Sequence, residues 1–321
     1  MRDETGRNIR YLRLSVTDRC NLRCLYCMPS EGVNPLSHSD ILTFEEILRL
    51  VRLATDLGID RVKVTGGEPL VRRGVVDLIR GLKALPKIDQ VTLTTNGALL
   101  EEYLPALVDA GTDGVNISID TLNREVYAKL TGFDDLARVL SSIRRAAEVL
   151  PVKLNVVPLE GVNDGELCDL AEMARRDVLA VRFIELMPVG RAERFSYPSS
   201  DSVKSAIETC FGSAEPCEER LGNGPAVYYR LENFEGKIGF IRAMSDSFCA
   251  DCNRVRLTAD GRFMPCLGRS DFADAKRVLR DGASDLELTK SLERTIFAKP
   301  TRHGFAEGRQ KPGRDMHMIG G

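Results

Sequence analysis

Short runs rich in β-branched residues alternate with amphipathic stretches along the first 185 residues of the chain. The β-rich runs predict six strands, at Ile9–Val16, Arg61–Thr65, Gln90–Thr94, Gly114–Ile119, Val152–Val157 and Ala180–Ile184. Helical spacing of apolar residues predicts helices between them, at Thr43–Leu57, Arg72–Leu85, Leu99–Ala110, Leu136–Leu150 and Gly165–Arg176. The Thr43-x-x-Glu46 start of the first helix is typical of a capping box. The alternation indicates an α/β protein with a parallel sheet and helices outside it.

Two architectures agree with six consecutive strand-helix units, an open (βα)6 barrel and a doubly wound sheet. Both place their chemistry at the C-terminal ends of the strands. In this chain those ends carry distinctive loops, which are Thr65-Gly66-Gly67-Glu68-Pro69, Thr94-Thr95-Asn96-Gly97, Ser118-Ile119-Asp120 and Glu185-Leu186-Met187. We therefore expect these loops to meet at one site.

The strand-helix rhythm changes after Met187, where proline and glycine interrupt it. The remaining patterns predict short strands at Ala226–Leu231, Lys237–Ile241 and Arg254–Thr258, and helices at Asp271–Arg280 and Asp285–Phe297. Because 321 residues exceed the usual size of a single core, we expect two domains, residues 1–220 and 221–321. The tail from Lys299 to Gly321 shows no period and is expected to be a loop or disordered until something binds it.

Charge and hydropathy exclude several classes of protein. Lys and Arg number 45 against 47 Asp and Glu, so the net charge of −2 offers no general attraction to nucleic acid or membrane. No run approaches the roughly 18 apolar residues of a membrane span, and the N-terminus has no apolar signal region. We expect a cytoplasmic protein that holds any anionic ligand with local cations.

Nine cysteines indicate metal more than disulfides, because the cytosol keeps thiols reduced. Six of them form two tight clusters, and the others are scattered at Cys168, Cys210 and Cys217. Histidine is scarce, with only His38, His303 and His317. This scarcity argues against an iron site of the kind built from two histidines and one carboxylate.

The first cluster, Cys20-x3-Cys24-x2-Cys27, directly follows the first predicted strand. Three thiolates at this spacing suit three irons of a four-iron, four-sulfur cube and leave the fourth iron open. The alternatives are three inert thiols or a zinc site, which needs four ligands, and His38 lies beyond the usual spacing.

With Tyr26 before its last cysteine, this cluster resembles the radical SAM superfamily. The resemblance implies that S-adenosylmethionine (SAM) binds the open iron and that one electron cleaves it to methionine and a 5′-deoxyadenosyl radical. Gly66-Gly67-Glu68-Pro69 resembles the superfamily's motif for the SAM amino group. Taken alone, those glycines would indicate a tight turn into a helix.

The second cluster is Cys249-x2-Cys252-x13-Cys266. Its spacing also suits a zinc knuckle, with Cys210, Cys217 or His303 as a distant fourth ligand. Its surroundings, Asp251-Cys252-Asn253-Arg254-Val255-Arg256 followed by Gly261 and by Gly320-Gly321 at the end, resemble the GTP 3′,8-cyclase family of molybdenum cofactor biosynthesis.

This resemblance implies a partial (βα)6 TIM-like barrel with a smaller C-terminal domain that binds a second [4Fe-4S] cluster. In the family, the radical removes hydrogen from C3′ of GTP, and the C3′ radical attacks C8 of the guanine at the second cluster. The product is a cyclic dihydroguanosine triphosphate, which a partner synthase converts to cyclic pyranopterin monophosphate. A low-potential electron donor is also implied, and a homodimer is left open.

Individual residues carry over from the family at matching positions. Those for SAM are Tyr26, Gly67, Ser118 and Met187. Those for GTP are Arg13, Lys63, Thr94, Lys153, Arg182, Arg254, Val255 and Arg256. The cations suit a triphosphate, which carries about four negative charges. One position departs from the family, because Lys63 stands where arginine is common, with Arg61 two residues before it.

The Gly320-Gly321 end is either a frayed terminus or a segment slim enough to enter a narrow site. The preceding arginines Arg302, Arg309 and Arg314 would then face SAM or the triphosphate. Two other kinds of protein agree with parts of the pattern, a peptide-modifying radical SAM maturase and a non-enzymatic zinc protein. The maturase commonly has more auxiliary cysteines, and the zinc protein leaves two open three-cysteine sets unexplained.

Overall fold

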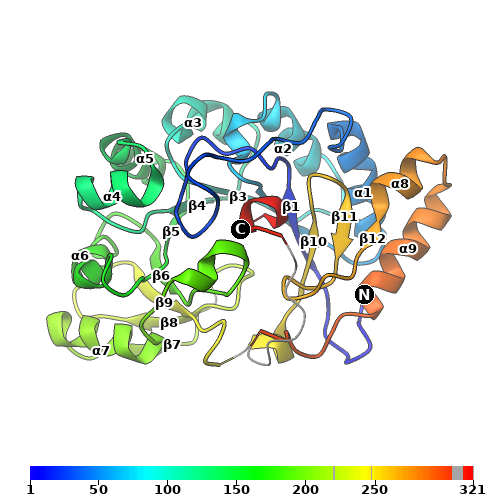
Figure 1. Ribbon diagram of the computed structural model, residues 1–321. Coiled ribbons are helices and arrows are strands. Elements are labelled where there is room, and N and C mark those ends of the chain that lie inside the picture. The colour runs from blue at the N-terminus through cyan, green and yellow to red at the C-terminus, as the bar shows by residue number, and fades with distance from the viewer. Residues whose placement is uncertain (220, 247, 306–313, 321) are drawn as a thin grey trace.

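The computed structural model describes residues 1–219, 221–246, 248–305 and 314–320 (Figure 1). Its strands form one sheet in the order β12-β11-β10-β1-β2-β3-β4-β5-β6-β9-β8-β7. The strands are β1 (Tyr11–Ser15), β2 (Arg61–Thr65), β3 (Gln90–Thr95), β4 (Val115–Ser118), β5 (Val152–Val156), β6 (Ala180–Ile184), β7 (Glu215–Cys217), β8 (Val227–Arg230), β9 (Lys237–Ile241), β10 (Arg254–Leu257), β11 (Arg262–Met264) and β12 (Ala273–Asp274).

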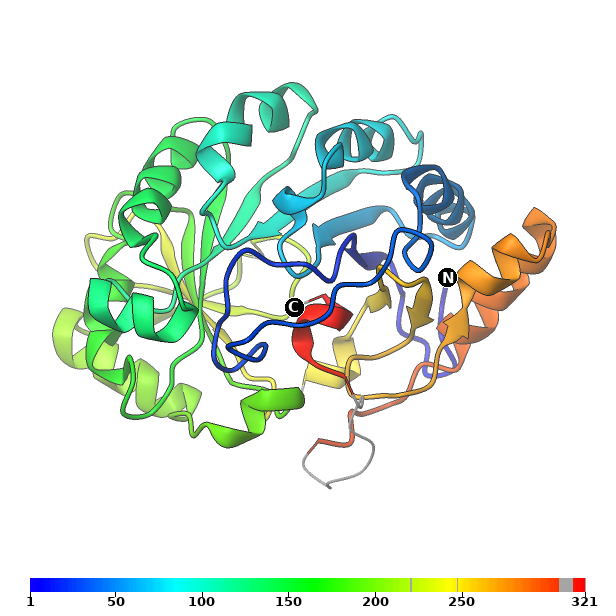
Figure 2. The same ribbon diagram turned by 45° about the horizontal axis from the view of Figure 1, so that its top comes forward.

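Helices cover the convex side of this sheet, as both ribbon views show (Figures 1 and 2). The α-helices are α1 (Phe44–Asp56), α2 (Val75–Lys83), α3 (Leu100–Asp109), α4 (Arg124–Thr131), α5 (Leu136–Ala147), α6 (Leu167–Glu172), α7 (Ser200–Phe211), α8 (Ala275–Arg280), α9 (Asp285–Phe297) and α10 (Met316–Ile319). Short 3-10 turns lie at η1 (Pro69–Val71), η2 (Asp164–Glu166), η3 (Gly190–Arg194) and η4 (Phe248–Asp251). Within the described residues, no helix has the length and apolar character needed to span a bilayer.

The strand order decides between the two expected architectures. Strands β1 to β6 are parallel and lie side by side in chain order. A doubly wound sheet would instead reverse its strand order at a switch point. The protein therefore has the open barrel, which β10 extends beside β1 and β9 extends beside β6. The division into domains 1–220 and 221–321 stays a prediction.

Each barrel strand has an apolar side and a polar side. On β2, Val62 and Val64 are fully buried beneath the helices, while Lys63 and Thr65 face the hollow of the barrel. This period of two is unusual for parallel strands, which are commonly apolar on both faces. It arises because the inner face lines a cavity instead of a packed core.

The predicted helix start at Thr43 is confirmed. The Thr43 hydroxyl accepts a hydrogen bond from the Glu46 N–H at 3.2 Å, and the Glu46 carboxylate accepts one from the Thr43 N–H at 2.8 Å. Helices α4 and α7 were not predicted, nor was α10, whose four residues are too few to show a period. The expectation that the tail lacks structure is wrong for residues 314–320, which place α10 in the mouth of the barrel (Figure 2).

A second correction concerns the scattered cysteines. Cys168 on α6 and Cys210 on α7 form a disulfide, although disulfides were not expected. The two positions are 42 residues apart, so their pairing depends on the packing of two neighbouring helices that the sequence spacing does not reveal. Cys210 is therefore not a free metal ligand.

Candidate active site

One cavity of about 580 Å³ occupies the hollow of the barrel. Both cysteine clusters line it, that is Cys20, Cys24 and Cys27 together with Cys249, Cys252 and Cys266. The four residues expected at SAM line it too, which are Tyr26, Gly67, Ser118 and Met187. So do seven of the eight expected at GTP, namely Arg13, Lys63, Thr94, Lys153, Arg182, Arg254 and Arg256. The exception is Val255, whose side chain is fully buried in the apolar core behind the strand.

The first cysteine cluster lies in the loop that follows β1. Burial raises the pKa of Cys20 to about 11 and that of Cys27 to about 12, and it raises the pKa of Cys24 well above its usual value. The charges of Cys27 and Cys20 also raise the pKa of Cys24, and the charge of Cys20 raises that of Cys27. Three such thiols become stable thiolates only beside a positively charged group, so this donor set fits a metal cluster.

The Gly66-Gly67 pair holds this loop against the end of β2. A Cβ on Gly67 would lie 2.4 Å from the carbonyl oxygen of Arg19, and one on Gly66 would lie 2.7 Å from that of Thr17. The Gly67 N–H donates to Thr17 O at 2.7 Å. Neither glycine has a positive φ. Close approach of two backbones therefore explains these glycines, and the segment also turns directly into η1, as the alternative of a tight turn into a helix expected.

Two buried carboxyl groups connect the loop to the neighbouring strands. Glu68 accepts hydrogen bonds from the Thr95 hydroxyl at 2.9 Å and from the Asn96 N–H at 2.7 Å, and burial raises its pKa to about 7. Asp120 accepts from the Tyr26 hydroxyl at 2.6 Å, and burial raises its pKa to about 6. These contacts fix Tyr26 and the strand ends around the first cluster.

The second cluster combines the turn η4 with the segment after β11. Burial would raise the pKa of Cys252, but Arg254 and Lys299 outweigh this effect and lower it to about 6. Lys299 was not predicted as a site residue, and it is only 3% exposed. Its ammonium donates to Arg254 O at 2.8 Å and to Pro265 O at 2.7 Å. Lys299 thus holds the two parts of the cluster together and favours the thiolate form of Cys252.

The zinc alternative for this second cluster needed a fourth ligand. Cys210 is bonded to Cys168, and the Nε2 atom of His303 lies 2.9 Å from Ala243 O. In the part of the chain that the structure describes, no group of three or more His, Cys, Asp or Glu side chains is arranged to hold a metal ion, and this applies to both cysteine triads.

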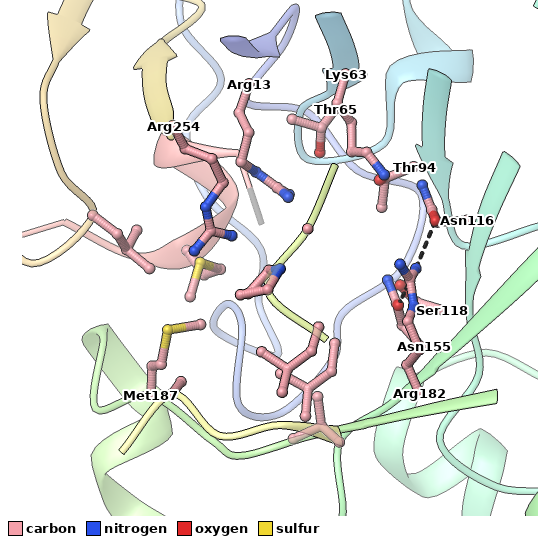
Figure 3. A pocket seen from close by; sticks show the side chains of 18 of the residues that line it. Arg13, Lys63, Thr65, Thr94, Asn116, Ser118, Asn155, Arg182, Met187 and Arg254 are labelled. Atoms are coloured by element: carbon pink, nitrogen blue, oxygen red, sulfur yellow. Dashed lines mark hydrogen bonds between the residues drawn. The ribbon is translucent and has the colours of Figure 1, made fainter. Parts of the chain in front are cut away.

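Positive side chains from several strands point into the same space, as Arg13, Lys63 and Arg254 do in Figure 3. Burial together with the charge of Arg182 lowers the pKa of Lys63 well below its usual value and that of Lys153 to about 8. Lys63, Lys153, Arg182, Arg254 and Arg256 form no ion pair with any carboxylate in residues 1–219, 221–246, 248–305 and 314–320. A cavity with this excess of buried positive charge is suited to a polyanion.

Lys63 is the cation that β2 contributes to the cavity. Arg61 lies at the start of the same strand, where its guanidinium contacts Asn223 and lies 3.5 Å from the Asp60 carboxylate. Arg61 is not among the residues that line the cavity. It therefore does not replace the arginine that the family commonly has at position 63.

The tail lines the cavity with Met316 and His317, and Gly320 lies against two of its lining residues, Thr65 and Arg256. The Arg256 guanidinium donates to Gly320 O, and a Cβ on Gly320 would lie 2.9 Å from Ser15 Cβ and from Thr65 Cγ2. Arg314 does not face the cavity, because its guanidinium forms an ion pair of 2.6 Å with Asp260. Arg302 is exposed, while Arg309 and Gly321 lie outside the described residues. The tail thus docks through Arg314, contributes Met316 and His317 to the cavity wall, and places the Gly320 carbonyl against Arg256.

Two known protein families match consecutive segments of the chain. Residues 14–174 match the Radical SAM superfamily, and residues 179–305 match the family described as Molybdenum Cofactor Synthesis C. Three curated relatives named GTP 3′,8-cyclase align over the full length of both chains. Those of Desulforamulus reducens and Moorella thermoacetica are 45% identical to this chain, and that of Clostridium perfringens is 41% identical.

Solved structures share the fold at low sequence identity. Streptococcus suis SuiB bound to S-adenosylmethionine superposes with a TM-score of 0.63 and 16% identity, covering 91% of this chain and 68% of that chain. HydG, a maturase of the [FeFe]-hydrogenase, superposes with a TM-score of 0.50 and 21% identity, covering 63% of this chain and 49% of that chain. At these identities the likeness concerns the fold alone.

Proposed function

The chain belongs to the GTP 3′,8-cyclase family within the radical SAM superfamily, and we propose that it cyclises GTP in the first step of molybdenum cofactor biosynthesis. The product would be (8S)-3′,8-cyclo-7,8-dihydroguanosine 5′-triphosphate, which makes the enzyme a radical SAM lyase. The observation that carries this proposal is a single cavity lined by two cysteine triads and by cations from several strands.

Cys20, Cys24 and Cys27 would hold the [4Fe-4S] cluster of the superfamily and carry catalysis, with SAM beside it. When bound, this cluster supplies the electron that cleaves SAM and so generates the radical that acts on GTP. Tyr26, Gly67, Ser118 and Met187 would contact SAM. The hydrogen bond of Tyr26 to Asp120 and the close approach at Gly67 support this assignment, because both hold the cysteine loop in place.

Cys249, Cys252 and Cys266 would hold a second [4Fe-4S] cluster, which meets the guanine base. A cysteine with a pKa of about 6 is largely thiolate near neutral pH, and thiolate is the form that binds iron. Lys299 and Arg254 thus prepare Cys252 as a ligand. The disulfide removes Cys210 from the three candidate fourth ligands of a zinc knuckle. Cys217 is a free thiol and the Nδ1 atom of His303 has no hydrogen-bond partner among the described residues, so metal analysis of the reconstituted protein has to distinguish iron from zinc.

The cations would bind the triphosphate and orient the ribose between the two clusters. Arg13, Lys63, Lys153, Arg182, Arg254 and Arg256 project from strands β1, β2, β5, β6 and β10. Thr94 would add a neutral contact from β3, and Val255 would contribute its backbone, since its side chain is in the core. Holding the substrate in a hollow that excludes water protects a radical from side reactions.

Partners form a further part of the proposal. The reaction needs a low-potential electron donor, because SAM cleavage consumes one electron for each event. Its product would pass to the synthase that makes cyclic pyranopterin monophosphate. A homodimer also belongs to the expectations, and sedimentation of the reconstituted protein would test it.

The decisive experiment is an anaerobic assay of the reconstituted protein with SAM, a low-potential reductant and GTP deuterated at C3′. Mass spectrometry should find deuterium in 5′-deoxyadenosine and a cyclised guanosine triphosphate, with about eight irons per chain. A Cys20→Ala variant, which lacks a ligand of the first cluster, should produce neither. Unchanged GTP beside cleaved SAM and a modified peptide would favour the maturase, and zinc with little iron would refute both radical enzymes.

A further inference from the structure

Two asparagines hold the guanidinium of Arg182 within the cavity. The Nη2 group of Arg182 donates to Asn116 Oδ1 at 2.5 Å and to Asn155 Oδ1 at 2.6 Å, and Figure 3 shows the three side chains together. They come from three neighbouring strands, β4, β5 and β6, and Asn155 is the direct register partner of Arg182. Both N–H groups of Nη2 are used in this way, and the Tyr228 hydroxyl also interacts with the guanidinium, while the buried Nε of Arg182 has no hydrogen-bond partner among the described residues.

The acceptors are neutral, which is unusual for a buried arginine. Arg182 is only 7% exposed, and arginines this deeply buried are commonly paired with a carboxylate. An amide oxygen can orient a guanidinium as a carboxylate does, but it leaves the positive charge uncompensated. The pair of asparagines therefore gives position to Arg182 without reducing its attraction for an anion.

The surrounding structure leaves Arg182 little freedom. The Nδ2 atom of Asn116 donates to Leu93 O at 3.2 Å, which fixes this amide with its oxygen toward Arg182. On the other side, a Cβ on Gly239 would lie 2.9 Å from Arg182 Cγ and 2.8 Å from the ring of Tyr228. The stem of Arg182 thus packs over a glycine while its head is held by two amides.

We propose that Asn116 and Asn155 are positioning residues that aim Arg182 at a phosphate group of the substrate and keep its full charge available. The proposal rests on the proposed function in taking the anion to be a triphosphate. It adds that phosphate binding by Arg182 depends on two uncharged residues, Asn116 and Asn155, which orient its guanidinium.

Asn155 offers the cleaner test, because the Asn116 amide also bonds to Leu93 O. Asn155→Asp keeps the acceptor and its size but neutralises Arg182, and Asn155→Ala removes the acceptor. Asn123→Asp is the matched control, since it makes the same charge change at the N-cap of α4, where aspartate also caps well. The probe is inorganic tripolyphosphate, titrated into the reconstituted holoenzyme by calorimetry, with guanosine as the phosphate-free comparison.

We expect Asn155→Asp to weaken tripolyphosphate binding about tenfold or more and Asn155→Ala about threefold, with guanosine binding unchanged. The control should bind both as the wild type does. The proposal would be overturned if Asn155→Asp bound tripolyphosphate as tightly as the wild type does, or if its affinity for guanosine fell by the same factor. Failure of the wild type to bind tripolyphosphate would also overturn it. If Asn155→Asp does not fold, the Asn155→Ala result decides by the same criteria.

The test is independent of the cyclisation assay. Suppose that the wild type binds tripolyphosphate and that Asn155→Asp binds it weakly, but that GTP is not cyclised. The proposed function then fails, and the role of the asparagines stands. If GTP is cyclised and Asn155→Asp binds tripolyphosphate normally, the function stands and this inference fails.

Discussion

Replacing Gly67 by alanine should release the cysteine loop from the end of β2. The new Cβ would lie 2.4 Å from Arg19 O and 2.8 Å from Asp18 O, whereas real Cβ contacts essentially never fall below 3.0 Å. Both neighbours are backbone atoms, so the loop itself must move, by about 0.6 Å at least. That shift strains the hydrogen bonds from Gly67 N to Thr17 O at 2.7 Å and from Glu68 N to Arg19 O at 2.8 Å.

The energetic effect follows from these contacts. Overpacking typically destabilises by about 1–3 kcal/mol, and each weakened hydrogen bond adds about 1 kcal/mol. A total near 3 kcal/mol corresponds to about a hundredfold fall in the equilibrium constant for docking of the loop. Because all three thiols of the first cluster lie on this loop, its cluster and SAM should be lost together.

The iron content of the protein measures the loss of the first cluster directly once the cysteines of the second cluster have been replaced. In a background with Cys249, Cys252 and Cys266 replaced by alanine, the parent should hold about four irons per chain. Gly67→Ala should hold less than one. Gly165→Ala is the matched control, because its Cβ would meet nothing within 4 Å and its φ is not positive. Full iron and unchanged SAM affinity in Gly67→Ala would refute the argument from close approach.

Three further predictions concern other parts of the molecule. Cys266→Ser should lose about half of the iron and weaken GTP binding while SAM cleavage continues, and unchanged turnover in an anaerobic assay would contradict its assigned role. Burial and Arg182 lower the pKa of Lys153 to about 8, so GTP affinity should fall as the pH rises through that value, and Lys153→Met should remove this step from the binding profile. Reducing the disulfide between Cys168 and Cys210, which are 42 residues apart, should lower the free energy of unfolding by about 4 kcal/mol. Denaturation with and without reductant measures this difference, and a double serine variant that still responds to reductant would exclude the disulfide as its cause.

Much of the barrel could be predicted from local pattern. The strands Arg61–Thr65, Ala180–Ile184 and Lys237–Ile241 and the helix Asp285–Phe297 begin and end where the sequence indicated. The pattern could not distinguish a barrel from a doubly wound sheet, because strand order is a property of long-range pairing. Helix α10 also escaped prediction, since its packing against Val189 and Met264 comes from distant segments.

Only some of the residues of the candidate site could be predicted from the sequence. The cations carried over from the family indicated an anion, whereas Asn116 and Asn155, which line the same cavity, were not among the predicted site residues. The sequence did show polar residues at every second position of these strands, although buried parallel strands are commonly apolar on both faces. Lys299 had no such signal, because its role depends on reaching Arg254 and Pro265 across the fold.

The sequence by itself carried the two cysteine triads and the motifs that resemble the GTP 3′,8-cyclase family, to which full-length relatives show that the chain belongs. It also determined the alternating strand faces, since residues two apart on a strand share a side. Only the tertiary structure decided that both triads, the cations and the tail residues Met316 and His317 share one hollow. It also decided that Arg314 anchors the tail, that Cys168 meets Cys210, and that neutral amides hold Arg182. These contacts join residues far apart in the chain, and no local pattern encodes which distant segments will meet.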